Sequence, residues 1–226
     1  MNLGFRVLKR NKVASKALVE AFAKLPVANV SDSMGRMTAG GPNLRRMNAS
    51  GGMSGVAVTV KSRPGDNRML HWAIDISGPG DVIVVDAGGD LTNAIFGEMM
   101  LAYAIKRGVA GLVINGAIRD ADEIREVNHP VYAAGVTHRG PYKDGPGEIN
   151  VPISICGMVV NPGDIIIGDG DGVLCVPQEE AAGVLELAKA KQAAEAKQMQ
   201  AIAEGKNDRS WVKQTLDERG CAFPET

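Results

Sequence analysis

Two short apolar segments, joined by one helix, restrict the fold of this chain more than any other feature. The segments are Asp81–Asp86 and Val109–Asn115, and each has the length and unbroken apolar character of a strand buried on both faces. Residues 97–107 between them predict a helix, which Gly108 ends as a C-cap. Because two strands connected by such a helix nearly always form a right-handed crossover, the sequence predicts a βαβ unit.

Shorter elements are predicted before this unit. Helical spacing that stops near Pro26 predicts the first helix, and β-branched alternation predicts the first strand. The predicted elements are a helix over 16–24, a short helix capped by Ser31 or Asp32, a strand over 56–60, and a helix over 66–76 with Asp66 as its cap.

The remainder of the chain predicts antiparallel strands and then a long helix. A short helix over 120–127 and a strand over 131–134 come first. The segment 153–176 then contains short apolar runs separated by turns, which is typical of antiparallel pairing. From 178 to 204 the chain is rich in Ala, Glu, Lys and Gln, which favour a helix.

These elements together predict an α/β fold. We expect a single mixed-sheet domain with a central βαβ unit, an antiparallel portion and a helical C-terminal arm. The domain is expected over residues 1–205 and a C-terminal helical tail over 206–226. A chain of 226 residues is long enough for one sizeable core, and its 45% hydrophobic and 23% charged residues are ordinary for a soluble globular protein.

Charge, apolar-segment length and cysteine use exclude several classes of protein. The net charge of -1 gives no overall basic field for nucleic acid or an anionic membrane. No segment approaches the roughly 20 apolar residues that span a bilayer, and the N-terminal residues lack the apolar stretch of a signal peptide. Cys156, Cys175 and Cys221 are widely separated, so we expect free thiols and a reducing cytoplasm.

Charged residues gather where the predicted central unit ends. Arg119 and Asp120 follow its second strand, and Glu98 lies at the start of its helix. Open α/β sheets build their sites at the carboxyl ends of their strands, so we expect these residues to face one crevice. The free backbone N–H groups at the start of the helix, residues 97–100, could hold a carboxylate there.

Two of these side chains have a structural alternative. Asp120 and Glu123 resemble a helix capping box, so Asp120 is an N-cap, a metal ligand, or both. Glu98 is a favourable acid in a first helical turn, a general base, or an outer-shell partner that holds a water on a metal. Arg119 lies directly behind a buried strand, where its planar guanidinium suits a substrate carboxylate or an enolate oxygen.

Other motifs give weaker indications. The segment 168–172 has acids at alternate positions but lacks the remaining ligands of a calcium loop, so we expect a hairpin turn. His71 could line the crevice or be a core or surface histidine, and the histidines have no spacing suited to zinc. Lys61 and Lys143 are conceivable Schiff-base lysines, although nothing in their local sequence depresses their pKa.

The charged motif and its surroundings resemble those of a known family. The segment that begins Gly97-Glu-Met-Met and ends Arg119-Asp120 resembles the RraA-like proteins, which include divalent-metal 4-hydroxy-4-methyl-2-oxoglutarate / 4-carboxy-4-hydroxy-2-oxoadipate aldolases. Its pattern is an acid, twenty intervening residues, Arg-Asp, two more residues and an acid, which Glu98, Arg119, Asp120 and Glu123 match. Most of residues 25–205 share the resemblance, through segments 30–34, 65–67, 79–86, 161–164 and 169–173.

The resemblance implies a role for each matched residue. It implies that Asp120 holds Mg²⁺ or Mn²⁺ largely through water and that Arg119 binds substrate as an electrophilic clamp. With Glu98, the candidate general base, they are the expected catalytic residues. The residues implied to bind the substrate carboxylate are Gly97, Glu98, Met99 and Met100. Cleavage of a 4-hydroxy-2-oxo acid leaves a pyruvate enolate, whose charge requires a Lewis acid and a cation. Oxaloacetate decarboxylation passes through the same enolate, so one site could serve both reactions.

The resemblance also implies an assembly and an alternative function. A homotrimer or homohexamer would have its sites between subunits, and Glu195 or Glu204 of a neighbouring subunit is a candidate to complete the site. The founding members of the family bind and inhibit ribonuclease E and lack the acid after the arginine. The presence of Asp120 therefore favours an enzyme. A third function, that of a methyltransferase, would need a glycine-rich cofactor loop after the first strand. The glycine-rich segment 51–55 precedes the strand, which argues against a methyltransferase.

Overall fold

The structure is a computed structural model that describes residues 2–37 and 40–224. Its strands are β1 (Phe5–Val7), β2 (Arg45–Arg46), β3 (Met53–Ser62), β4 (Asp81–Asp86), β5 (Ala94–Phe96), β6 (Gly111–Ile118), β7 (Val131–Val136), β8 (Gly147–Ile149), β9 (Ile153–Ile155), β10 (Met158–Val160), β11 (Ile165–Gly168) and β12 (Val173–Val176). Its helices are α1 (Lys16–Phe22), α2 (Val27–Ser33), α3 (Arg68–Ile76), α4 (Glu98–Lys106), α5 (Ala121–Val127), α6 (Ala181–Ala203) and α7 (Ser210–Glu218).

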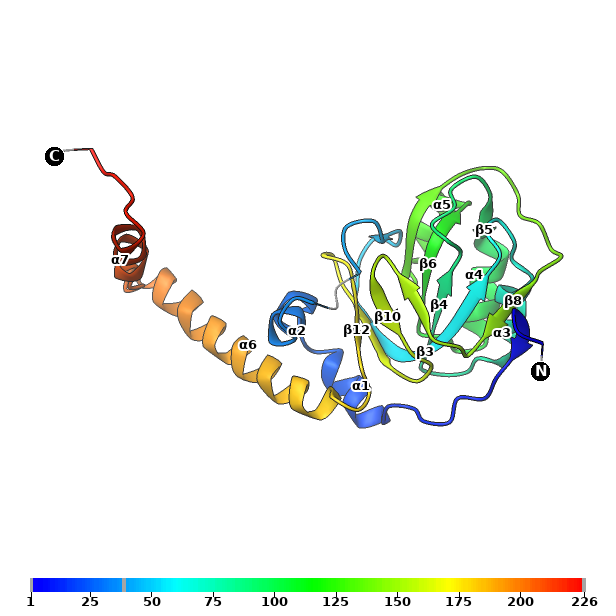
Figure 1. The fold of residues 1–226 in the computed structure, drawn as a ribbon, viewed down its shortest axis with the longest axis horizontal. Helices are drawn as coiled ribbons and strands as arrows, with labels where there is room; N and C mark the ends of the chain where they lie inside the picture. The colour runs from blue at the N-terminus through cyan, green and yellow to red at the C-terminus, as the bar shows by residue number, and fades with distance from the viewer. Residues whose placement is uncertain (1, 38–39, 225–226) are drawn as a thin grey trace. The chain divides into compact units, whose positions relative to one another are not determined.

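A mixed β-sheet forms the centre of the first of two compact units, Met1–Ala188 (Figure 1). Its main strands lie in the order β1-β8-β3-β4-β6-β7-β2, with β5 beside β6, β11 beside β3 and β12 beside β11. Strands β3, β4, β6 and β7 are parallel neighbours, and α3, α4 and α5 connect them in turn. The predicted βαβ unit is therefore confirmed, as the middle of three consecutive crossovers.

The antiparallel portion of the fold is confirmed as well. β11 pairs antiparallel with both β3 and β12, and β9 and β10 form a separate antiparallel pair. The turn between β11 and β12 is closed by a hydrogen bond from the N–H of Asp169 to the carbonyl of Gly172, 3.0 Å long. The segment 168–172 is thus the hairpin turn that the sequence predicts.

Apolar side chains bury both faces of the parallel strands. Ile83 of β4 belongs to a core cluster with Leu101 of α4, and both are at most 1% exposed. Val84, the next residue, belongs to a second cluster with Ile155 of β9. Burial on both faces explains why the predicted strand has no polar alternation.

One predicted helix cap is wrong. Ser31 and Asp32 lie inside α2, whose N-cap is Pro26 with an extended backbone, φ -60° and ψ 138°. Proline needs no hydrogen bond for its own nitrogen and is therefore tolerated at a helix start. The first helical N–H, that of Val27, donates to the carboxylate of Asp169 at 2.9 Å. The cap is thus supplied by a residue far away in the sequence, which a local pattern does not reveal.

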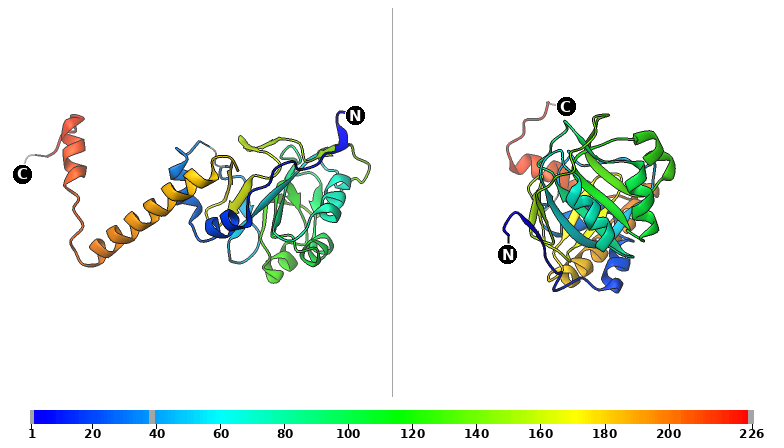
Figure 2. Two further views of the ribbon diagram at one scale, coloured as in Figure 1. Left: turned by 90° about the horizontal axis from the view of Figure 1, so that it is seen from below. Right: turned by 90° about the vertical axis from the view of Figure 1, so that its right-hand side faces the viewer.

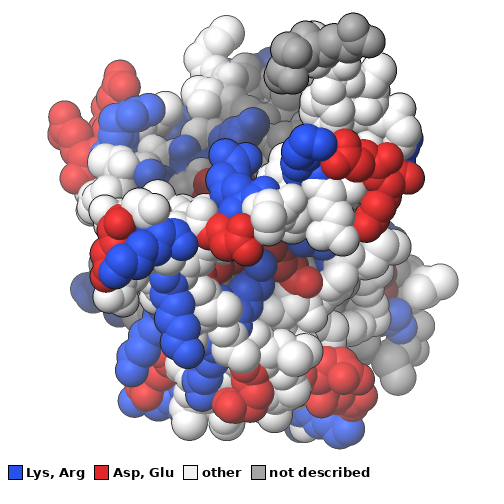
Figure 3. All heavy atoms as spheres, turned by 90° about the vertical axis from the view of Figure 1, so that its left-hand side faces the viewer, with Lys and Arg blue, Asp and Glu red and all other residues white. Residues whose placement is uncertain are grey.

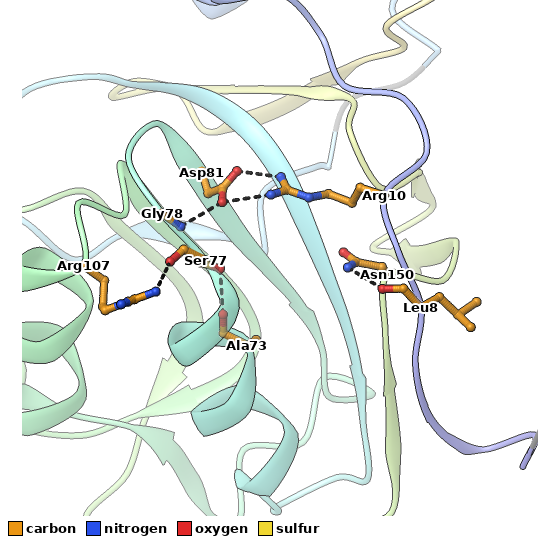
Figure 4. Close-up of polar contacts among 8 residues, drawn as sticks. All are labelled: Leu8, Arg10, Ala73, Ser77, Gly78, Asp81, Arg107 and Asn150. Carbon is orange, nitrogen blue, oxygen red and sulfur yellow. Dashed lines mark hydrogen bonds and ion pairs between the residues drawn. The ribbon is translucent and has the colours of Figure 1, made fainter.

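The N-terminal segment is fastened to the start of β4 (Figure 4). The guanidinium of Arg10 makes a bidentate contact with the carboxylate of Asp81, with Nη2 3.0 Å from Oδ2. The same carboxylate accepts the backbone N–H of Gly78 at 2.9 Å. Nearby, the side-chain amide of Asn150 donates to the carbonyl of Leu8 at 2.9 Å. These contacts hold the chain before α1 against the sheet.

The second compact unit is Lys189–Thr226. It contains most of α6, which Figure 2 shows as one continuous helix, and α7, which has no buried residue. Gly205, with φ 68°, lies in the turn between the two helices. The predicted helix over 178–204 and the helical tail are confirmed, whereas the predicted domain boundary at residue 205 stays a prediction.

Neither the helices nor the surface charge of the described residues points to a membrane-spanning segment or to a surface of one charge. Among these residues, no helix is both long enough and apolar enough to cross a membrane. On the face drawn in Figure 3, lysine and arginine side chains alternate with aspartate and glutamate.

The three cysteines are free thiols, as the sequence predicts. Cys175 is buried, Cys156 is half-buried and Cys221 is exposed. Burial raises the pKa of the Cys175 thiol, and the nearby carboxylate of Asp164 raises it further. The Cys175 thiol therefore stays protonated and is inert.

Candidate active site

The short strand β5 brings the two ends of the predicted site together. It pairs in parallel with the end of β6, and the N–H of Arg119 donates to the carbonyl of Phe96 at 3.0 Å. Because Phe96 directly precedes Gly97, this pairing places the start of α4 beside Arg119 and Asp120. β5 is not predicted from the sequence, because three residues are too few to show an alternation.

Asp120 has a left-handed backbone conformation, with φ 56° and ψ 46°. It is the N-cap of α5 by position, but its side chain makes no capping bond to that helix. Its Oδ2 instead accepts the backbone N–H of Glu98 in α4, at 2.9 Å. The capping box with Glu123 is therefore wrong, since an N-cap normally needs an extended backbone. Such conformations cost energy in non-glycine residues and cluster at functional sites.

Gly97 is required by the close approach of its neighbours. A Cβ atom at this position would collide with Oδ2 of Asp120 and lie 3.2 Å from Cγ of Arg119. The backbone of Gly97 is extended, with φ -163°, so the glycine is not needed for its conformation. Any larger residue here would displace the two charged side chains.

Arg119 is half exposed and only loosely paired. Its Nε lies 3.7 Å from Oδ2 of Asp120, and 46% of its side chain is exposed. Its guanidinium reaches toward the loop after β7, because a Cβ atom at Gly140 would lie 3.6 Å from Nη1. The guanidinium thus remains available for a ligand.

One pocket of about 290 Å³ collects these residues. From the predicted set it is lined by Gly97, Glu98, Met99, Met100, Arg119 and Asp120. The structure therefore brings the predicted site residues together, while their chemical roles stay predictions.

The pocket has a second wall, which comes from other elements. It is formed by Asn67, His71, Pro141 and Lys143. Asn67 is the N-cap of α3 at the carboxyl end of β3, and the N–H of His71 donates to its carbonyl at 3.0 Å. Open α/β sheets build their sites at the carboxyl ends of their strands, and this rule, which identified Arg119, could also have identified Asn67. Lys143 lies on a loop whose path has no sequence signal.

Asp66 fastens the loop that carries Lys143. Its buried carboxylate accepts the backbone N–H groups of Arg68 at 2.9 Å, Asp144 at 2.7 Å and Gly145 at 2.8 Å. Burial by itself raises the pKa of Asp66, but these hydrogen bonds outweigh it and bring the pKa below its ordinary value. The predicted cap residue therefore bonds the first N–H of α3 and also holds the pocket loop, while Asn67 occupies the cap position.

His71 is held in its neutral form. Partial burial lowers the pKa of His71, the charges of Lys143 and Arg68 lower it further, and Asp75 opposes them. A neutral imidazole both donates and accepts a hydrogen bond, so His71 adds an adaptable polar group to the second wall.

The donor set of the pocket fits a hydrated Mg²⁺ or Mn²⁺ ion. Among the described residues, no three His, Cys, Asp or Glu side chains converge closely enough to hold a metal. Zinc sites require such a cluster, whereas Mg²⁺ keeps several waters and is bound by one or two carboxylates together with its substrate. Asp120 supplies one carboxylate, 35% exposed, at the pocket.

The start of α4 retains two backbone donors for a ligand. The first helical bond of α4 runs from the N–H of Leu101 to the carbonyl of Gly97, at 3.1 Å. The three preceding N–H groups therefore have no helical acceptor, and Asp120 uses that of Glu98. Of the four residues predicted to bind a carboxylate, 97–100, Met99 and Met100 therefore keep a backbone N–H for a ligand, and the role of the set stays a prediction.

The two candidate acids from the C-terminal region lie in the second compact unit. Glu195 pairs with Lys191 at 3.1 Å, and Glu204 pairs with Lys206 at 3.0 Å. Their predicted contribution to the site of a neighbouring subunit stays a prediction.

Comparison with known proteins finds one family. Residues 27–175 match the family model RraA-like, described as Aldolase/RraA. A protein of Halalkalibacterium halodurans named as a putative 4-hydroxy-4-methyl-2-oxoglutarate aldolase is 39% identical over 186 residues, which cover 82% of this chain and 89% of that protein.

Solved structures share the same fold. An uncharacterized protein from Pseudomonas syringae matches with a TM-score of 0.78 at 27% identity, over 86% of this chain and 96% of that one. The RNA-processing inhibitor RraA from a Thermus species matches with a TM-score of 0.63 at 30% identity, over 68% of this chain and 93% of that one.

Proposed function

Because the chain belongs to the RraA-like family, we propose that it is a divalent-metal-dependent aldolase, a carbon–carbon lyase. It cleaves a 4-hydroxy-2-oxo acid to pyruvate and a second oxo acid, and it also decarboxylates oxaloacetate. The observation that carries the proposal is the convergence of Arg119, Asp120 and the start of α4 in one pocket. A carboxylate, a guanidinium and free backbone donors are the groups that an enolate-forming site requires.

Each residue has a defined task in this proposal. Asp120 holds the Mg²⁺ or Mn²⁺ ion, which when bound supplies the positive charge that an enolate needs. The N–H groups of Met99 and Met100 bind the carboxylate of the pyruvate portion, with the positive end of the helix dipole behind them. Arg119 donates to the oxo group that becomes the enolate oxygen. Glu98, exposed at the pocket, is the general base or holds a water that moves the proton.

The wider setting of the enzyme belongs to the same proposal. It acts in the cytoplasm on a small oxo acid as a homotrimer or homohexamer, without a nucleic-acid or membrane partner. The family supports the assembly, the near-neutral charge of the chain argues against a nucleic-acid partner, and the free cysteines support the cytoplasm.

The proposal is tested by pyruvate release from oxaloacetate. Purified protein is assayed after EDTA treatment and again after addition of Mg²⁺, beside the Asp120→Ala variant. We expect Mg²⁺ to restore turnover in the wild type and not in the variant, because the carboxylate that holds the ion is gone. Oxaloacetate also decarboxylates unaided, so the variant supplies the baseline. Equal rates in wild type, variant and buffer would contradict the proposal.

Ribonuclease E binding is the competing function, since a solved RraA inhibitor shares the fold. An inhibitor needs no carboxylate in a strained conformation beside a helix start, so the geometry of Asp120 favours the enzyme. Binding of purified ribonuclease E by a protein that lacks lyase activity would reverse this preference.

A further inference from the structure

The proposed cleavage requires two proton transfers, which take place at different atoms of the substrate. One proton must leave the 4-hydroxyl group, and another must reach C3 of the pyruvate enolate. Glu98 lies at the start of α4, beside the groups that bind the pyruvate portion, so it can serve C3. The 4-hydroxyl group lies two carbons beyond the oxo group and extends toward the second wall of the pocket. A base for this hydroxyl group is therefore expected in the second wall.

Among the four residues of the second wall, only His71 has a side chain that can take up a proton at neutral pH. The amide of Asn67 is not a base, Pro141 has no polar side chain, and the ammonium of Lys143 is a donor only. An imidazole has an ordinary pKa of about 6.5 and is the commonest general base of enzymes. His71 is exposed and lines the pocket, so a ligand there can reach its ring.

The surroundings of His71 keep its ring unprotonated. Partial burial lowers the pKa of His71 most, and the charges of Lys143 on the pocket loop and Arg68 on α3 lower it further. Asp75, one turn further along α3, opposes them, but its carboxylate already accepts the hydroxyl of Tyr103 from α4, at 3.0 Å. A neutral imidazole has a nitrogen lone pair that can accept a proton, as a general base requires.

One buried carboxylate fixes His71 and Lys143 relative to each other. Asp66 accepts the first N–H of α3, the helix that carries His71, and two N–H groups of the pocket loop directly after Lys143. The helix and the loop are therefore tied to the same group. Such fixed placement matters for a general base, because a misplacement of about 1 Å can cost about 100-fold in rate.

We infer that His71 is the base that takes the proton of the 4-hydroxyl group during cleavage, while Glu98 serves C3. The inference rests on the proposed function, because it places the pyruvate portion at the start of α4. One ring nitrogen of His71 accepts the hydroxyl proton as the C3–C4 bond breaks. The electron pair of that bond forms the pyruvate enolate, and C4 with its oxygen becomes the oxo group of the second product. A water held by Glu98 gives a proton to C3, and the proton on His71 restores that water through the solvent.

The test compares two reactions that share the enolate but differ in this proton transfer. Cleavage of 4-hydroxy-4-methyl-2-oxoglutarate requires loss of the hydroxyl proton. Decarboxylation of oxaloacetate forms the enolate by loss of CO₂ and needs no base. Both rates are measured with Mg²⁺ present for the wild type, His71→Ala and His138→Ala. His138 is exposed and is not among the residues that line the pocket, so its variant is the matched control.

We expect His71→Ala to slow cleavage by about 100-fold or more, the usual contribution of a general base, and decarboxylation by no more than about threefold. Added imidazole should restore part of the cleavage, because it can enter the space of the lost ring. His138→Ala should match the wild type in both reactions. Equal losses of the two reactions in His71→Ala, or an unchanged rate of cleavage, would overturn the inference.

The pH profile of cleavage gives a second measurement of the same role. In the wild type, kcat/KM should fall on the acid side as His71 becomes protonated. Lys143→Met removes a charge that lowers the pKa of His71, so this acid limb should move to higher pH, whatever the height of the profile. An acid limb at the same pH in both proteins would overturn the inference. Absence of both reactions from the wild type would instead overturn the proposed function.

Discussion

Because Gly97 has no side chain, the Asp120 carboxylate can lie directly against the start of α4. We predict that Gly97→Ala lowers kcat by about 100-fold, because the added methyl group displaces the Asp120 carboxylate and small misplacements of catalytic groups have effects of this size. The fold should be retained, since the backbone of Gly97 is extended and alanine adopts that conformation freely. Steady-state kinetics and circular dichroism together measure the two effects.

Gly140 provides the matched control for this variant. It also lies beside Arg119, but a Cβ atom there would be 3.6 Å from Nη1, an ordinary van der Waals distance. Gly140→Ala should therefore keep its activity within about twofold. Equal losses in the two variants would mean that crowding near Arg119, and not displacement of Asp120, is responsible.

Arg119, Asp120 and Glu98 could be predicted as site residues because each lies at the end or the start of a recognisable element. Arg119 and Asp120 end an apolar strand, and Glu98 begins a helix, so the strand-end rule brings them to one edge. The conformation of Asp120 could not be predicted, because the carboxylate bonds a residue that only β5 brings near. Lys143 was missed as a pocket residue because its loop is positioned by Asp66, far away in the sequence.

Two ion pairs of the segment between β1 and α1 differ strongly in exposure, so their contributions to stability can be compared. We predict that Arg10→Ala lowers the free energy of unfolding by about 1–3 kcal/mol, because it leaves the largely buried Asp81 without its charged partner. Lys12→Ala removes an ion pair with Glu179 whose side chains are both 73% exposed, and should cost under about 1 kcal/mol. Urea unfolding measures both losses. Equal losses would show that the Arg10–Asp81 pair stabilises the fold no more than an exposed ion pair does.

A helix or strand could be predicted where its own residues and their close sequence neighbours determine it. Strand β4 has its predicted bounds because both of its faces are buried and its apolar residues, 82–85, lie between two aspartates. The start of α2 was misplaced because its first N–H is capped by Asp169, and β5 was missed because its three residues are ordered by pairing with β6. Contacts distant in sequence decide these cases.

The fold class of the whole molecule was predictable because alternating strands and helices admit few arrangements. The parallel centre, the antiparallel addition of β11 and β12, and the C-terminal helices all follow from periodicity and turn residues. The oligomeric state cannot be predicted in the same way, because the surfaces between subunits have no regular spacing of residues in the sequence. The homotrimer or homohexamer thus rests on family membership.

The stability of the whole molecule should fall as the pH drops from 7 to 5. Burial lowers the pKa of His129, opposed in part by a hydrogen bond to the carbonyl of Val109, and burial also lowers the pKa of His71. Both histidines therefore bind a proton more readily when unfolded, so their contribution is complete above the unfolded pKa of about 6.5 and is lost as the pH falls through their folded values. The pKa of Asp66 lies below its ordinary value of 3.8, so the contribution of Asp66 is lost only in stronger acid and lies outside this interval.

His129→Gln separates this effect from other acid-dependent changes. The variant removes the titrating ring, so its melting temperature should fall less than that of the wild type between pH 7 and pH 5. His138→Gln removes an exposed histidine and should leave the pH dependence of the wild type unchanged. Since Nε2 of His129 is buried without a hydrogen-bond partner among the described residues, a proton placed there has no acceptor, and the folded state must open to accommodate it. Parallel melting curves for all three proteins would show that the stability loss in this interval arises elsewhere.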